Sequence, residues 1–191
     1  MESETLTKTL EVLKTISDLE TALAEFYLFC SQVRETEKDF WLPLEQDERK
    51  HAQKVQEMAL MLEDGRSLVV LNTSFNVTPV HNLKSFIAKS LKRLQTYQIP
   101  TDFKTLLSIA WNIEYSIMEI KYNDLFSIAE QGYEKLMQTI LSETAAHRGQ
   151  LGSKITAMRN SPSKGHNRPV PKMQNESSRR NSQKGHALKL H

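Results

Sequence analysis

The stretch Leu44-Glu-Gln-Asp-Glu-Arg-Lys-His-Ala52 places a carboxylate and an imidazole within the apolar face of a helix. Apolar residues continue the same face at helical spacing, at Leu44, Val55, Met58 and Leu62. Glu48 and His51 share that face, so both side chains are predicted to point into a core. Because burying an unpaired carboxylate is costly, the sequence predicts that something in the core offsets the charge of Glu48.

The preceding segment has a similar interruption. A helix is predicted from about Ser3, which can cap it, to Val33, with apolar residues at three- and four-residue steps. Glu20 interrupts this apolar face, and Tyr27 follows one heptad later. One Glu from one helix and a Glu-x-x-His from the next form the ligand set of carboxylate-bridged metal sites in helical bundles. The two segments together therefore favour a buried metal site.

Turn signals divide residues 1–159 into two helical hairpins. The helices are predicted at about 3–33, 36–64, 101–132 and 133–159, with Asp64-Gly65 ending the second and Gly132 ending the third. The connection between the hairpins loses helical periodicity over 66–81 and then contains a short helix from Asn82 to about Gln98. This order predicts an all-α fold, a four-helix bundle with a long crossover.

The second hairpin is similar to the first. Asn112-Ile-Glu-Tyr-Ser-Ile-Met-Glu119 matches Asp18-Leu-Glu-Thr-Ala-Leu-Ala-Glu25 in polarity at almost every position, so that Glu114 repeats Glu20. Aligning the following helices on their histidines pairs His51 with His147, Asp47 with Glu143, and Glu48 with Thr144. The second hairpin therefore looks like a divergent copy whose Glu-x-x-His is broken at Thr144.

Together these motifs resemble the rubrerythrin-like branch of the ferritin-like superfamily over roughly residues 5–158. The resemblance rests on Phe40-Trp41 before the Leu44–Ala52 stretch, on the Glu20/Tyr27 spacing, and on the 112–121 and 142–147 segments. It implies a ferritin-like four-helix bundle with a non-haem di-iron centre. It also implies redox chemistry with peroxide or oxygen, or iron oxidation. The ligands carried over by position are Glu20, Glu48, His51, Glu114 and His147.

Two residues depart from the family pattern. Thr144 stands where a second bridging Glu is expected, and Glu143, which shares a helical face with His147, is the candidate replacement ligand. Lys121 stands at the position that matches Tyr27. Tyr27 is predicted to hydrogen-bond a ligating carboxylate, whereas the ammonium of Lys121 could neutralise the carboxylates without metal.

Two functions follow from these observations. One is a metal-binding protein of redox character, with iron or another divalent metal, which reduces peroxide or oxidises iron. It would need an external electron donor, because the single Cys30 cannot form a thiolate metal cage. The alternative is a non-catalytic bundle with a degenerate site, an interaction or structural protein in which Lys121 and protonated histidines balance the buried carboxylates.

The distribution of charged and apolar residues along the chain indicates which partners to expect. From Asn160 onward the sequence has seven basic residues and one acid, a net +6, which leaves −4 for the rest of the +2 chain. We interpret residues 160–191 as a disordered, solubilising tail, and nucleic acid is expected to bind at most weakly there. The basic residues of the crossover helix, Lys84, Lys89, Lys92 and Arg93, are interpreted as its solvated side. With no apolar run of about 20 residues and no signal segment, we expect no membrane partner and a cytoplasmic location, and a homodimer is possible.

Overall fold

The structure is a computed structural model, and it describes residues 2–65, 69–72, 74–120, 122–129 and 131–160. Contacts divide the chain into Met1–Ser161 and Pro162–His191, and the second unit, with the predicted tail, lies outside the described residues. The described residues are mostly helical, as the all-α prediction requires. Their elements are α1 (Glu2–Val33), η1 (Glu35–Glu37), α2 (Lys38–Glu63), β1 (Val69–Leu71), α3 (Thr78–Gln95), α4 (Phe103–Glu119), η2 (Tyr122–Asp124), β2 (Phe126–Ala129) and α5 (Gln131–Asn160).

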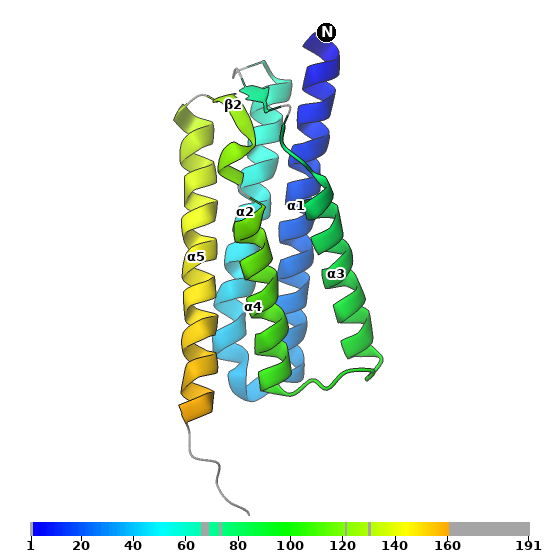
Figure 1. Cartoon of the computed structure of the whole chain (residues 1–191), viewed down its shortest axis with the longest axis vertical. Helices are drawn as coiled ribbons and strands as arrows, with labels where there is room; N and C mark the ends of the chain where they lie inside the picture. The colour runs from blue at the N-terminus through cyan, green and yellow to red at the C-terminus, as the bar shows by residue number, and fades with distance from the viewer. Residues whose placement is uncertain (1, 66–68, 73, 121, 130, 161–191) are drawn as a thin grey trace, which may run out of the picture. The chain divides into compact units, whose positions relative to one another are not determined.

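The four helices around the core, α1, α2, α4 and α5, lie side by side with nearly parallel axes (Figure 1). α1 packs mainly on α2, and α4 packs on α5, so each pair forms a helical hairpin. α2 also contacts α5, while α3 packs outside them against α1 and α4. This arrangement turns one face of each of α1, α2, α4 and α5 toward a common interior.

The core contains the apolar faces that the sequence predicts. Leu13, Ile16 and Leu23 of α1 are almost completely buried, as are Val55 and Met58 of α2. Full burial of a side chain of this size stabilises the fold by about 1.5–3 kcal/mol. The helices are therefore fixed around the interior by their apolar contacts, and the polar residues of the same faces are carried inside with them.

Two predicted helix boundaries are wrong. α3 begins at Thr78 rather than Asn82, because Pro79 is well suited to a first helical turn and the side chain of Asn76 accepts a hydrogen bond from the Thr78 N–H. α4 ends at Glu119 rather than near Gly132. The residues beyond it form β2, which pairs antiparallel with β1 through an irregular register. Backbone pairing between distant segments thus overrides the helical pattern there.

Other boundaries follow local signals. Asp102 caps α4 by accepting a hydrogen bond from the Thr105 N–H at 3.0 Å, and Gly65 after α2 adopts a φ of 62°. The two other predicted helix starts differ: Ser3 lies inside α1 rather than before it, and Thr36 lies in η1, two residues before α2, whose N-cap is Glu37. No helix among the described residues combines the length and the apolar character needed to span a bilayer.

Candidate metal centre

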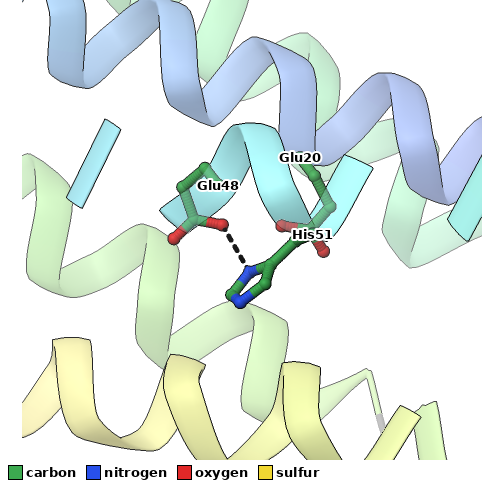
Figure 2. A group of neighbouring side chains, drawn as sticks. All are labelled: Glu20, Glu48 and His51. Carbon is green, nitrogen blue, oxygen red and sulfur yellow. Dashed lines mark hydrogen bonds and ion pairs between the residues drawn. The ribbon is translucent and has the colours of Figure 1, made fainter. Parts of the chain in front are cut away.

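The five ligands suggested by the sequence meet in the interior. Glu20 comes from α1, Glu48 and His51 from α2, Glu114 from α4 and His147 from α5, and all five are buried. They form two groups that could each hold a metal ion, one of Glu20, Glu48 and His51, the other of Glu48, Glu114 and His147. Within each group, one ligand atom per residue lies within 4.8 Å of the others. Figure 2 shows the first group, with the carboxylate of Glu48 facing the ring of His51 and the side chain of Glu20 beside His51 in this view.

Glu48 lies at the centre of the site because it belongs to both groups. Its Oε2 lies 2.9 Å from Nδ1 of His51, and its Oε1 lies 2.8 Å from Nδ1 of His147. The two imidazole rings stack with centroids 5.8 Å apart. Each oxygen of one carboxylate thus faces a different imidazole, which is the placement required of a bridging ligand.

The outer nitrogens of the two histidines have carboxylate partners of their own. Nε2 of His51 lies 2.7 Å from Glu143, and Nε2 of His147 lies 3.4 Å from Asp47. The two contacts are reciprocal. Glu143 lies four residues before His147 in α5 but contacts His51 of α2. Asp47 lies four residues before His51 in α2 but contacts His147 of α5. Such partners fix the orientation and tautomer of a metal-binding imidazole.

Glu143 lies in neither ligand group. Its side chain is 41% exposed and is also bonded by Nζ of Lys54 at 2.9 Å. Asp47 is bonded in the same way by Nζ of Lys50 at 2.7 Å. Asp47 was not among the predicted site residues, although the alignment of the two histidines pairs Asp47 with Glu143 and could have indicated it.

The hydroxyl of Thr144 makes a hydrogen bond within its own helix. The buried side chain donates a hydrogen bond to the carbonyl of Ile140, one turn earlier in α5, at 2.9 Å. The hydroxyl proton is therefore used within its own helix. The site has three buried carboxylates, and Glu48 is the only one common to both ligand groups.

Two buried tyrosines contact the terminal carboxylates. Tyr27, expected beside a ligating carboxylate, donates its hydroxyl to Oε1 of Glu114 at 2.6 Å. Tyr122 makes the corresponding but longer contact with Oε1 of Glu20, at 3.5 Å. Lys121 lies outside the described residues. Tyr122 was not predicted, because the sequence pattern predicts an uninterrupted helix there, whereas α4 ends at Glu119 and Tyr122 lies in η2.

Two carboxylate oxygens in the site have no hydrogen-bond partner among the described residues. They are Oε2 of Glu20 and Oε2 of Glu114, both inaccessible to solvent. A buried acceptor without a partner is costly, so each such atom requires an explanation. A metal cation beside Glu48 would supply the missing partner to both, and the donor set therefore fits metal binding.

The electrostatics of the metal-free site separate the carboxylates into two kinds. Burial, followed by repulsion from Glu48, raises the pKa of Glu20 well above its usual value and that of Glu114 to about 7. Burial acts to raise the pKa of Glu48 too, but hydrogen bonds from His147 and His51 bring it to about 2. Burial acts to lower the pKa of His147, and Glu114 and Glu48 overcome this and raise it to about 10. Without metal, Glu48 and His147 thus carry opposite charges while Glu20 retains its proton.

Comparison of the chain with protein-family models, with curated proteins and with solved structures finds no match. The chemistry of the site is therefore inferred from its own donors. Carboxylate oxygen and imidazole nitrogen without thiolate suit iron, zinc, manganese and nickel ions rather than soft metals. The described geometry supports the general conclusion that Glu20, Glu48, His51, Glu114 and His147 could hold a metal ion.

Proposed function

We propose that this protein is a di-iron protein of redox character with a rubrerythrin-like, ferritin-like four-helix bundle made of α1, α2, α4 and α5. The observation that carries the proposal is the pair of ligand groups that share Glu48. One carboxylate common to two adjacent groups is the arrangement expected for two ions rather than one. Iron is proposed because the sequence motifs resemble those of di-iron proteins, and another divalent ion would use the same donors.

In this proposal Glu48 would be a ligand shared by the two ions. Glu20 and His51 would help to hold one ion, while Glu114 and His147 would help to hold the other. The unpartnered oxygens of Glu20 and Glu114 are then satisfied. Iron held there would carry electrons from an external donor to peroxide or oxygen; alternatively, ferrous iron would be the substrate and peroxide or oxygen the oxidant.

The remaining polar residues of the site orient the side chains that would hold the ions. Asp47 and Glu143 hold the outer nitrogens of the two imidazoles, so that Nδ1 of each ring faces Glu48. Tyr27 fixes the carboxylate of Glu114. The surrounding apolar side chains exclude water. Since Cys30 is the only cysteine and is buried, we propose that the electrons come from a separate donor.

A second candidate function is a non-catalytic interaction or structural protein. It is favoured by Glu48, whose two oxygens already have imidazole partners without metal, and by Thr144 in place of a second bridging carboxylate. In that case the buried polar groups form an ion-pair network that specifies how the helices pack.

Metal stoichiometry distinguishes the two functions. The full chain and its Glu48→Gln variant would be loaded with ferrous iron without oxygen, freed of unbound ion, and measured by elemental mass spectrometry. Glu45→Gln is the matched control, because Glu45 is a buried carboxylate on the same helix that pairs with Arg49 outside the site. We expect about two ions per chain in the wild type and the control, as the shared-carboxylate arrangement implies, and a marked loss in Glu48→Gln.

Reaction with peroxide then tests the redox character. Loaded wild-type protein should oxidise its iron on addition of peroxide, followed by absorbance, and an added reductant should restore the ferrous form. The same loading would be repeated with zinc and with manganese. A chain that takes up none of the three metals would refute the metal proposal and favour the structural alternative. Metal uptake without oxidation would refute only the redox part.

A further inference from the structure

A groove lies on the outside of the molecule, where α3 and α4 run antiparallel (Figure 1). Its volume is about 750 Å³, within the usual range for ligand sites. Phe86 of α3 and Tyr115 of α4 line it, with 43% and 44% of their surfaces exposed. The amides of Asn82 and Asn112 lie on the same two helices and also line the groove. The groove thus combines exposed aromatic rings with groups that can both donate and accept hydrogen bonds.

Tyr115 is held in place by its neighbours. Its ring stacks on Trp111 with centroids 5.5 Å apart and planes 22° from parallel. The guanidinium of Arg148 lies 5.9 Å from its ring centroid. These contacts orient an aromatic ring that remains almost half exposed, so little conformational freedom would be lost when a planar ligand stacks on it.

The same α3 helix carries a ridge of positive charge beyond the groove. The cationic ridge consists of Lys89, Lys92 and Arg93, all exposed and without an ion pair among the described residues. The fourth basic residue of α3, Lys84, pairs with Asp18 of α1. No acidic residue occurs in α3, so its charge is +4 in a chain whose total is +2. Among the described helices, α3 therefore carries the largest net positive charge.

The cationic ridge follows directly from the groove. Phe86 lies one helical turn before Lys89, and Arg93 lies one turn further, so the three share one side of the helix and extend over about 10 Å. Tyr97, 87% exposed, lies just beyond the end of α3. The groove lining also contains an acidic residue, Glu119. Glu119 lies at the end of the groove away from the cationic ridge, because α4 ends beside the start of α3 (Figure 1). Aromatic rings and cations thus follow one another along a single path.

We propose that the groove and the cationic ridge bind single-stranded nucleic acid without sequence preference. A base would stack on Tyr115 and Phe86 and use the amides of Asn82 or Asn112, while the following phosphates contact the cationic ridge. Alternating stacking platforms and backbone-neutralising cations are the elements by which proteins bind single strands. The sequence pattern alone favoured a solvated helix face, and the exposed aromatic groove beside the cations is what the structure adds.

Other occupants fit this surface less well. In a symmetric dimer the same patch meets its own copy, so the cationic ridges would repel each other if this face were the contact. Insertion into a membrane requires a broad apolar face, but Val80, Leu83, Ile87 and Leu94 of α3 are already buried, which leaves Phe86 as the exposed large apolar residue of this helix. A single strand needs only the exposed rings and the unpaired cations.

Fluorescence anisotropy with a labelled thymidine oligonucleotide of about twenty nucleotides, long enough to cover several binding sites, tests the proposal on the full chain. The variants are Phe86→Ala and Lys89→Glu, both at exposed positions. The matched control is Lys135→Glu, which reverses an exposed lysine on α5 that has no ion pair among the described residues. We expect Phe86→Ala to weaken binding about tenfold, as loss of one stacked base does. Lys89→Glu should also weaken it and should reduce its salt dependence.

Several outcomes would overturn the proposal. One is absence of binding by the wild type at low salt. Another is affinity that neither Phe86→Ala nor Lys89→Glu changes, which would assign any binding to basic residues elsewhere in the chain. Equal weakening by Lys135→Glu would attribute the effect to net charge. Dimerisation that Phe86→Ala abolishes would assign the groove to a second copy.

Discussion

Replacement of Glu48 by Leu should be the most informative perturbation of the buried site. In the metal-free protein, Glu48 partners both His51 and His147 and holds the charge that balances His147. Removing one member of a buried ion pair costs about 3–5 kcal/mol. We expect the lower end, about 3 kcal/mol, because Oε1 of Glu114 lies 3.5 Å from Nδ1 of His147 and can become its partner.

Metal should enlarge this difference. At a free metal concentration of 100 times Kd, the wild type gains about 2.7 kcal/mol of stability, whereas a variant that cannot bind gains nothing. The gap between wild type and Glu48→Leu should therefore grow from about 3 to about 6 kcal/mol when metal is present. In a chain of this size, 3 kcal/mol corresponds to a Tm shift of about 6–12 °C.

Urea denaturation measures the metal-free stability loss and the metal-induced gain. It is followed by the helical circular dichroism signal under anaerobic conditions, with and without ferrous ion. Glu45→Gln should lose less than about 1 kcal/mol, because its partner Arg49 is half exposed, and should keep the full metal response. Equal stabilisation of wild type and Glu48→Leu by metal would refute the assignment of Glu48 as the shared ligand. A metal-free Glu48→Leu as stable as wild type would refute the charge balance with His147.

Three further predictions concern the groups around the ligands. Tyr27→Phe removes the hydroxyl that donates to Glu114 at 2.6 Å. Calorimetric titration with metal should then show about 10–100-fold weaker affinity. Unchanged affinity would mean that this contact does not orient the ligand. Glu143→Gln should weaken metal binding over the same range by releasing His51, whereas Glu134→Gln, at an exposed position of the same helix, should not. The pKa of Glu114 is raised from 4.5 to about 7 in the folded chain, so the stability it contributes is complete below pH 4.5 and is lost as pH rises to about 7. Thermal scans across that interval should show metal-free stability falling while the metal-induced Tm shift grows, since metal displaces the proton; a metal-induced shift independent of pH would contradict this assignment.

The contacts around His51 show where sequence reasoning reaches its limit. Helical periodicity places Glu48 and His51 on one buried face, and the similarity of the two hairpins adds His147 on another. Periodicity does not state which helix faces which. That Glu143 contacts His51, and Asp47 contacts His147, follows from the packing of α2 against α5.

The end of α4 shows a second limit. Glu114 and the residues before it follow the helical pattern, but beyond Glu119 the chain forms β2, whose partner β1 lies more than fifty residues earlier. Strand pairing over such a separation has no local signal. It also changes the register after the helix, and for this reason Tyr122 lies beside Glu20 without having been predicted.

The sequence by itself determined the main helices, their apolar faces and the five buried residues that could hold a metal ion, because all of these depend on spacing within a few residues. Only the tertiary structure decided that Glu48 lies between His51 and His147, that two acids from opposite helices hold the imidazoles, and that α3 and α4 leave an aromatic groove beside the cationic ridge. The physical reason is that periodicity fixes the direction of a side chain relative to its own helix. The neighbour it meets is set by packing between segments far apart in the chain.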